Sequence, residues 1–378
     1  MKALFVSGDP TAFDSASPTR TRLRAYAERI GTLHYLSPAP RDGREETDGA
    51  LILHPVHAGK LLRPFALARV ARSLVRSESI EVVSAQDPFE HGWAALRAVQ
   101  GTSAKLHIQV HTDFLSPWFV RAQVFRSMRV PAPFLNTIRR RIADRILPRS
   151  AGIRAVSLRV AESIVARYGA TVPAPSVIPV AVDPRAPAPV ALPEHGFSFA
   201  FITVSRLAPE KRIEDLLMAL GRFSFRYPGV GLIIVGDGPE RVRLERLSRK
   251  LGLIDRVLFL GEREDARALM GSAQCFLQAS AYEGYGRTLV EAALAKIPII
   301  TTDVGIVGEV LKGYEEVLAT PPGDPANLAG HMEAIIQNHQ LRLSLVMNAE
   351  HAVRAHLAAY PDQPRLIAED LARALGTR

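Results

Sequence analysis

The chain has 378 residues, of which 47% are apolar and 22% charged, a composition typical of soluble globular proteins and unlike that of disordered or collagen-like chains. This length exceeds one ordinary core, so we expect two domains. The single cysteine, Cys275, excludes a disulfide framework and a zinc site made of several thiolates. The N-terminal apolar run is too short for a signal peptide, and no stretch reaches the roughly 18 apolar residues of a spanning helix. We therefore expect a cytoplasmic protein that does not cross a membrane.

Positive charge is concentrated in the first half of the chain. The whole chain carries a formal net charge of +9, which divides into +11 for residues 1–190 and −2 for residues 191–378. Arginine dominates over lysine in the first half, which suits phosphate recognition. The two halves are therefore expected to bind different partners.

Short apolar runs alternate with helical patterns through the first half. Helical spacing covers residues 65–76 and 158–168. The expected strands are residues 2–7, 81–84, 105–110, 153–157 and 176–179. Such alternation predicts a parallel sheet with helices on both faces.

A proline-rich stretch, residues 180–196, is the candidate interdomain linker, after which the alternation resumes. After Pro209, apolar residues at 213, 216, 217 and 220 form one helical face. The expected strands of the second half are residues 199–204, 232–235, 257–260, 275–278 and 297–301.

The chain thus divides into two doubly wound, Rossmann-like α/β domains. We expect an N-terminal domain over residues 1–190 and a C-terminal domain over 191–360, facing each other across a cleft. Residues 361–378 are expected to form a helix that packs back on the N-terminal domain. In such sheets ligands bind at the carboxyl ends of the strands.

Two cations flank the start of the helix expected at Pro209. Arg206 follows the strand 199–204, and Lys211 lies in the first turn of the helix. A helix N-terminus offers unpaired backbone N–H groups, so two cations beside it suit a diphosphate. Two solvated surface charges would give the same pattern.

A glycine-rich loop precedes another expected helix. Glu283 lies in the loop with Gly284 and Gly286, and Glu291 lies inside the helix. Carboxylates accept hydrogen bonds from sugar and ribose hydroxyls. A helix-start residue and a carboxylate on a wet face are the alternative interpretation.

A Gly-x-Gly pair, Gly236 and Gly238, follows the strand 232–235. The third glycine of a dinucleotide fingerprint is missing, because position 241 is arginine. The sequence therefore argues against a nicotinamide cofactor.

Taken in order, these motifs resemble the retaining family 4 glycosyltransferases, which have the GT-B fold. The resemblance is carried by Arg206 with Lys211, by residues 235–239, 259–261 and 298–305, and by Glu283 with Glu291 eight positions later. It covers about residues 199–340 closely. Residues 82–88, 110–113 and 177–183 of the first half match more loosely. The position after Lys211, where the family usually has glycine, holds Arg212.

The resemblance implies that the N-terminal domain, residues 1–190, binds the acceptor and that the C-terminal domain, residues 191–360, binds the nucleotide-sugar donor. It also implies a role for each matching position. Arg206 and Lys211 would hold the nucleotide diphosphate. Glu291 would bind the ribose hydroxyls, and Glu283 and His111 would contact the transferred sugar. The remaining implied contacts, to phosphates, sugar or base, involve Gly8, Gly238, Glu262, Arg263, Gly284, Tyr285, Gly286, Arg287 and Thr288.

No metal ion is expected at this site. The chain contains no Asp-x-Asp motif, so a metal-dependent transfer would lack its usual ligands. His107 and His111 lie on a strand-like segment without an evident third ligand, and His54 with His57 is no stronger. We expect no required cofactor, with the nucleotide-diphosphate sugar as donor substrate.

A basic segment, Arg121 to Arg149, carries eight arginines against one acid, with Phe114, Trp118, Phe119, Phe125 and Phe134 interleaved. It predicts a surface for an anionic membrane or a lipid-linked or phosphorylated acceptor. A solvated helix face with aromatic core contacts fits the same pattern, and no motif supports nucleic acid binding.

The sequence therefore predicts a retaining, metal-independent glycosyltransferase that uses a UDP- or GDP-linked sugar and a glycan, lipid-linked or phosphorylated acceptor. A catalytically idle nucleotide-binding scaffold of the same fold, or a related sugar-nucleotide epimerase or phosphorylase, remains the alternative. The expected location is cytoplasmic, at the inner face of the membrane.

Overall fold

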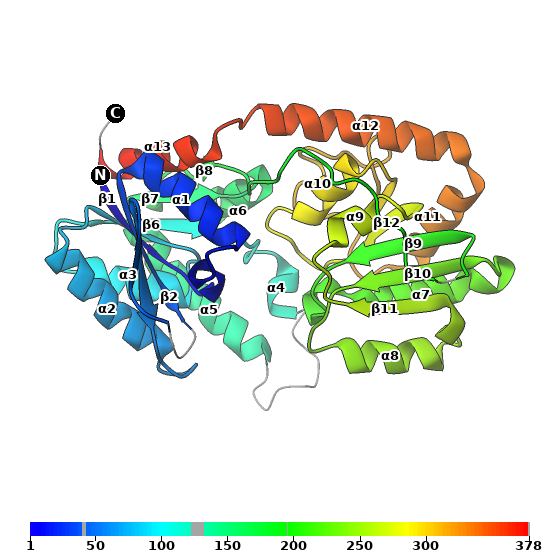
Figure 1. Cartoon of the computed structure of the whole chain (residues 1–378), viewed down its shortest axis with the longest axis horizontal. Coiled ribbons are helices and arrows are strands. Elements are labelled where there is room, and N and C mark those ends of the chain that lie inside the picture. Colours follow the sequence, from blue (N-terminus) through cyan, green and yellow to red (C-terminus); the bar gives the residue numbers. More distant parts are fainter. Residues whose placement is uncertain (40–42, 122–131, 195, 377–378) are drawn as a thin grey trace. The chain divides into compact units, whose positions relative to one another are not determined.

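The computed structural model describes residues 1–39, 43–121, 132–194 and 196–376. The chain divides into two compact units, each an α/β unit on a mainly parallel sheet (Figure 1). The first unit consists of Met1–Leu115, Phe134–Pro179 and Tyr360–Arg378, and the second of Ser116–Pro133 and Val180–Ala359.

The first unit contains an eight-stranded sheet in the order β3-β4-β2-β1-β5-β6-β7-β8, in which, among the described strands, only β3 runs antiparallel to its neighbour. Its strands are β1 Lys2–Val6, β2 Thr32–Pro38, β3 Glu46–Asp48, β4 Leu51–Val56, β5 Val82–Ala85, β6 Lys105–Val110, β7 Gly152–Ala155 and β8 Ser176–Val177. Its helices are α1 Pro18–Ile30, α2 Arg63–Ser77, α3 Glu90–Val99, α5 Ala132–Ile146, α6 Leu158–Tyr168 and α13 Gln363–Leu375.

Strand β1 is central in this sheet and is buried on both faces. Leu4 and Phe5 are fully buried, as expected for a parallel strand covered by helices on each side. The chain passes from β1 to β2 on one side and later returns to β5 on the other. The carboxyl ends of β1 and β5 therefore mark a topological switch point, where α/β sheets bind ligands.

The last helix, α13, packs within the first unit beside α1 (Figure 1). The Tyr26 hydroxyl donates to Gln363 Oε1 at 2.8 Å, and Arg29 pairs with Asp362 at 2.9 Å. Ile367 and Leu371 join the buried cluster of this unit. The amphipathic pattern after residue 363 thus has its apolar face in the core of the first unit.

The second unit contains a six-stranded parallel sheet in the order β11-β10-β9-β12-β13-β14. Its strands are β9 Phe199–Val204, β10 Val230–Val235, β11 Val257–Gly261, β12 Cys275–Gln278, β13 Ile299–Thr302 and β14 Leu318–Thr320. Its helices are α4 Pro117–Arg121, α7 Ile213–Phe223, α8 Arg241–Lys250, α9 Ala266–Met270, α10 Arg287–Leu294, α11 Pro325–Gln337 and α12 His339–Ala358.

The apolar face predicted after Pro209 is confirmed, because Ile213, Leu216, Leu217 and Leu220 are all buried in the core of the second unit. The start of that helix differs from the prediction. Residues 209–211 form a short 3-10 turn, and α7 begins only at Ile213. The break falls at Arg212, whose φ of 48° lies in the left-handed region that an α-helix cannot contain.

Candidate functional site

The second unit has its own switch point between β9 and β12. The chain runs from β9 to β10 and β11 on one side, then returns to β12 on the other side of β9. The carboxyl ends of β9 and β12 are where a doubly wound sheet binds its ligand. The segments that follow these two strands, residues 205–212 and 279–291, carry most of the residues that the sequence singled out.

Lys211 and Glu283 meet at this switch point. The Lys211 ammonium lies 2.5 Å from Glu283 Oε1, and the Ser280 hydroxyl donates to the same oxygen at 2.7 Å. Thr302 fixes Ser280 in turn, by donating to its carbonyl at 2.6 Å. Both charged side chains are mostly buried, with 23% and 15% of their surfaces exposed. The pair is a charge-assisted hydrogen bond on a rigid strand end, a suitable contact for a phosphate and a sugar hydroxyl.

Arg206 lies apart from this pair. Its side chain is 69% exposed and donates to Glu210 Oε1 at 2.6 Å. The Glu210 carbonyl accepts the backbone N–H of Ala281 at 2.8 Å, which joins the turn after β9 to the segment after β12. Arg206 is thus a solvent-facing cation at the edge of the site.

Arg212, the residue after Lys211, is anchored to the second unit by Asp215. Its guanidinium donates two hydrogen bonds to Asp215, at 2.6 and 2.8 Å, and the Asp215 side chain is fully buried. The same guanidinium lies 5.4 Å from the ring centre of Trp118 on α4. The left-handed backbone explains why glycine suits this position, and the bidentate pair explains how arginine is held there.

Glu291 lies on the buried side of α10, with 7% of its side chain exposed. Arg287, one turn earlier, donates to Glu291 Oε1 at 2.8 Å, and Arg267 Nε lies 3.7 Å from the same oxygen. Arg267 was not among the residues singled out from the sequence, and only its place in the fold brings it to Glu291. Its Nη2 also donates to the carbonyls of Asp183 and Arg185 at 3.0 and 3.2 Å.

Several buried polar atoms of the second unit have no hydrogen-bond partner among the described residues. They include Ser205 Oγ after β9, Gln278 Nε2 at the end of β12 and Arg267 Nε on α9, where no described residue supplies a hydrogen bond. The Thr288 hydroxyl donates to the amide oxygen of Gln278, Oε1, at 2.9 Å, and does not bond its Nε2. Unsatisfied buried groups destabilise a fold, so their presence beside a switch point indicates a polar ligand.

The glycine-rich loop offers its backbone rather than its side chains. The Tyr285 side chain is buried, and its hydroxyl hydrogen-bonds His356 Nε2 at 3.1 Å. Gly286, with φ of 89°, caps the N-terminus of α10. The Tyr285 carbonyl accepts the N–H of Ile306, and a Cβ at Gly305 would lie 2.4 Å from it. Gly284 and Gly286 thus fit a loop that must pack closely while leaving N–H groups at a helix start.

The Gly236–Gly238 turn is a packing element. A Cβ at Gly236 would lie 2.0 Å from the Ser205 carbonyl, and one at Gly238 would lie 2.4 Å from that of Leu207. The Leu207 N–H donates to the Asp237 carbonyl at 2.8 Å. These glycines let two loops join next to Arg206, as expected for a turn that is not a dinucleotide fingerprint.

Glu262 and Arg263 lie on the exposed turn after β11. Both are exposed, and Arg263 makes two hydrogen bonds to Asp265, at 2.8 and 2.7 Å. They lie at the carboxyl edge of the sheet, two strands away from the β9 strand end that leads to Lys211.

In the first unit, Gly8 follows β1 at the switch point of that sheet. A Cβ there would lie 2.8 Å from His91 Cε1, so a larger residue would have to displace the His91 ring. His91 pairs with Asp87, which follows β5 and also accepts the N–H of Phe89 at 2.8 Å. Although burial opposes it, the Asp87 carboxylate raises the pKa of His91 above its ordinary value. The sequence analysis missed this dyad, because its residues carry no recognisable motif.

His111 follows β6 at the same edge. Its Nε2 lies 3.2 Å from Gln109 Oε1. Burial, assisted by the positive charges of Arg154 and Arg22, lowers the pKa of His111 to about 3. His107 is instead a buried structural residue, bonded to Ser84 and Asp370 at 2.9 Å each. Within the described ranges, no group of three or more His, Cys, Asp or Glu is arranged to hold a metal ion.

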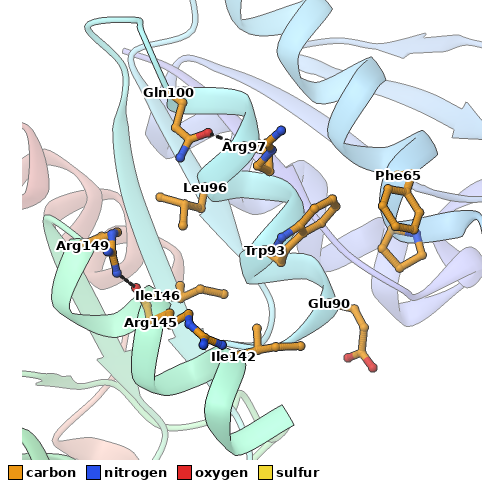
Figure 2. Close-up of a pocket in the computed structure, with 11 residues that line it drawn as sticks. Phe65, Glu90, Trp93, Leu96, Arg97, Gln100, Ile142, Arg145, Ile146 and Arg149 are labelled. Carbon is orange, nitrogen blue, oxygen red and sulfur yellow. Dashed lines mark hydrogen bonds between the residues drawn. The ribbon is translucent and has the colours of Figure 1, made fainter. Parts of the chain in front are cut away.

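A further cavity, of about 510 Å³, lies among α2, α3 and α5 (Figure 2). Trp93, Ile142 and Ile146 form apolar walls, and Arg145 and Arg149 lie at one end. No ion pair to either arginine is found in the part of the chain that the structure describes. The cavity thus combines an apolar interior with unneutralised positive charge.

The basic segment predicted from the sequence is only partly described, since residues 122–131, with Arg126 and Arg129, lie outside the described ranges. Phe114 and Phe119 are buried, so these two aromatic residues belong to the core and not to a surface. Phe134 is 60% exposed. None of the described helices is long and apolar enough to span a bilayer.

Known proteins resemble this chain in sequence and in fold. Over 148 residues, 39% of this chain, the sequence is 36% identical to one component of human phosphatidylinositol N-acetylglucosaminyltransferase, and the match spans only 30% of that protein. Sucrose-phosphate synthase from Thermosynechococcus elongatus has a TM-score of 0.78 and 22% identity, covering 99% of this chain and 98% of its own. Anabaena HepE in complex with UDP-glucose has a TM-score of 0.73 and 20% identity, covering 98% and 100%.

At such identities the structural likeness speaks for the fold alone, and it confirms the expected class of two parallel-sheet α/β domains of the GT-B kind. The sequence models are more specific. Residues 20–186 match the model described as Glycosyltransferase Family 4, and residues 192–352 match the one described as Glycosyl transferases group 1. Together these models cover most of both units, and the chain therefore belongs to the family 4 glycosyltransferases.

Proposed function

We propose that the protein is a retaining glycosyltransferase that transfers a sugar from a UDP- or GDP-linked donor to an acceptor hydroxyl without a metal ion. The observation that carries this proposal is the Lys211–Glu283 pair at the switch point of the second unit. HepE, which shares the fold, is described in complex with UDP-glucose, and this supports a nucleotide sugar as donor.

In the proposed reaction, the bond between the anomeric carbon and the diphosphate oxygen breaks, and a bond to the acceptor oxygen forms on the same face. The leaving phosphate takes the acceptor proton. Negative charge then grows on the diphosphate, where Lys211 and Arg206 provide fixed positive charge. The backbone N–H groups at the start of α10 add to it.

The donor's other groups are assigned to the same unit. Glu291 binds the ribose hydroxyls, and the hydrogen bond from Arg287 and the contact with Arg267 orient its carboxylate. Glu283 accepts a hydroxyl of the transferred sugar. The base lies near Glu262 and Arg263. From the first unit, His111 contacts the sugar and Gly8 the phosphates.

The acceptor is proposed to be glycan, lipid-linked or phosphorylated, and to be met at an anionic membrane surface on the cytoplasmic side. The cavity with Arg145 and Arg149 supports this, since an apolar tail and an anionic head would each find a matching partner there. The exposed apolar side chains of Leu61, Leu62 and Phe65, near the start of α2, add apolar surface nearby.

Donor turnover tests the proposal directly. Purified protein is incubated with UDP-, GDP- and ADP-linked sugars and candidate acceptors, in the presence of EDTA, and release of free nucleotide is measured with the anomeric configuration of the product. Transfer with retention, lost in Lys211→Met and kept in the exposed control Lys250→Met, is the expected result. An EDTA-reversible requirement for Mg²⁺ or Mn²⁺ contradicts metal independence. No turnover of any donor favours the idle scaffold.

A further inference from the structure

A row of buried polar side chains crosses the first unit from α13 to the end of β6. Asp370 Oδ2 lies 2.9 Å from His107 Nε2, and His107 Nδ1 lies 2.9 Å from Ser84 Oγ. Ser84 Oγ lies 3.0 Å from Gln109 Nε2. Gln109 Oε1 accepts from Arg154 Nη1 at 2.7 Å and lies 3.2 Å from His111 Nε2.

The sheet register places these residues side by side. Ser84 on β5 pairs with His107 on β6, and Gln109 on β6 pairs with Arg154 on β7. Of the six, all but His111 are nearly completely buried. Each polar atom in the row must therefore find its hydrogen bond within the protein, because water is excluded.

The two ends of the row fix the direction of every bond. Arg154 can only donate, so the Gln109 atom that faces it is the amide oxygen. The amide nitrogen then donates to Ser84, whose hydroxyl proton is left for His107 Nδ1. His107 carries its proton on Nε2 and donates to the Asp370 carboxylate, which can only accept. Hydrogen bonding to His107 holds the pKa of Asp370 below its ordinary value, although burial opposes this.

This direction decides the state of His111. Gln109 Oε1 accepts, so His111 must carry a proton on Nε2 to bond it. The charged groups that act on His111 are Arg154, Arg22 and Asp87. Two of these three are cations, and with burial they keep the ring neutral. A neutral ring with a proton on Nε2 has a bare Nδ1, which can only accept a hydrogen bond.

We propose that Gln109 is a positioning residue that holds His111 as the Nε2–H tautomer, so that its Nδ1 accepts a hydrogen bond from a hydroxyl of the bound sugar. Arg154 orients Gln109, and the Ser84–His107–Asp370 row prevents its amide from turning over. The role of His111 towards sugar rests on the proposed function, whereas the tautomer does not.

The tautomer is measured without substrate, by ¹⁵N and ¹H correlation of the histidine rings in the whole protein from pH 5 to 8. The expected wild-type result is a neutral His111 with Nε2 protonated throughout. Gln109→Met removes the acceptor, and Arg154 keeps its other two acceptors, the carbonyls of Ile178 and Pro179, at 3.0 and 2.9 Å. In Gln109→Met, His111 should show a mixture of tautomers.

Gln109→Glu keeps the acceptor and adds a negative charge. His111 should remain protonated on Nε2, and its pKa should rise so that the ring titrates within the measured range. The exposed Gln340→Met serves as the matched control and should leave His111 unchanged. A wild-type ring protonated on Nδ1, or an unchanged tautomer in Gln109→Met, overturns the proposal.

Kinetic measurements then distinguish a failure of the proposed function from a failure of the positioning role of Gln109. With the donor found by the turnover assay, kcat of Gln109→Met should fall about tenfold, the effect of one hydrogen bond, with donor KM unchanged. Gln109→Glu should recover part of the rate and gain an acidic limb in its pH profile. A correct tautomer in a protein that turns over no donor contradicts the proposed function alone. A normal kcat in Gln109→Met contradicts the positioning role alone.

Discussion

The Lys211 ammonium and the Glu283 carboxylate lie 2.5 Å apart although 72 residues separate them in the chain. Parallel strands explain this, because β9 and β12 are neighbours whose carboxyl ends meet at one edge. The pair holds each partner in place before any ligand arrives, and such preorganisation is what electrostatic catalysis requires.

Removing either member should therefore damage catalysis more than folding. We expect Lys211→Met to lower kcat by about 10²- to 10³-fold, the range seen when one preorganised group is removed. Glu283→Gln should retain the hydrogen bond from Ser280 and lose less. Nucleotide-release kinetics and melting temperatures measure both. A rate within twofold of wild type in Lys211→Met would falsify the assignment of this lysine.

Glu291 should control nucleotide affinity. In Glu291→Ala, the ribose hydroxyls lose their acceptor, while Arg287 is exposed enough to be solvated. A panel of UDP, GDP, ADP, CMP and TDP in a thermal-shift assay tests this. A nucleotide at about 100 times its Kd should stabilise the wild type by about 2.7 kcal/mol. The shift should vanish in Glu291→Ala and persist in Glu369→Ala, a helix-surface control. Equal shifts in both proteins would remove Glu291 from the site.

The protein should be more stable with arginine than with glycine at position 212, although the arginine backbone is strained there. Arg212→Gly removes the strain of a left-handed backbone, which should stabilise the fold by about 1 kcal/mol. It also leaves the fully buried Asp215 carboxylate without its partner, which should destabilise the fold by about 3 to 5 kcal/mol. We expect a net loss of about 2 to 4 kcal/mol in urea unfolding. Adding Asp215→Asn should restore much of it. A stabilised Arg212→Gly protein would show that the pair contributes nothing.

The Asp87–His91 dyad should make stability depend on pH. The folded pKa of His91 is raised above 6.5, so its contribution is complete below 6.5 and is lost as the pH rises through the folded value. The folded pKa of Asp87 is lowered below 3.8 by His91 despite burial, so its contribution is lost only in acid.

The difference in unfolding free energy between wild type and His91→Gln isolates this effect from the other histidines. It should be largest near pH 5 to 6 and shrink towards pH 9. A difference that stays constant over that range would mean that folding leaves the pKa of His91 unchanged and that Asp87 does not raise it.

Membrane contact should depend on charge and on the two cavity arginines. We expect salt-sensitive binding to anionic liposomes, and weaker binding in Arg145→Glu with Arg149→Glu. Arg365→Glu with Arg249→Glu, at two exposed side chains, changes the net charge by the same amount and is the control. Sedimentation with liposomes measures the bound fraction. Equal binding to neutral liposomes, or none to either, contradicts an electrostatic surface.

Much of the fold could be predicted from apolar runs. Residues 105–110 and 275–278 match β6 and β12 at both ends, because each is a compact buried run. Strands β2 and β4 were missed. His34, Ser37 and Pro38 interrupt the first, and His54 and Pro55 interrupt the second. The two histidines are buried and hydrogen-bond each other at 2.9 Å.

The site residues, too, could be predicted only in part. Glu283 and Glu291 stood out because a motif carries them, and motif order is visible in a sequence. Asp87 and His91 did not, because two residues four positions apart carry no recognisable motif, and Arg267 did not, because its partner Glu291 comes from another helix. Hydrogen-bond direction, which defines the state of His111, depends on burial and cannot be read from residue types alone.

The contacts of α13 have a consequence for how the protein is made. The first unit begins at Met1 but contains Tyr360–Arg378, so its last helix leaves the ribosome after the entire second unit. Until then, the faces that receive Ile367 and Leu371 are open to water, and His107 has no Asp370 to bond. The second unit can fold as soon as its own residues emerge, whereas the first must wait until α13 has emerged. The half of the chain that is translated first is therefore the half that is completed last.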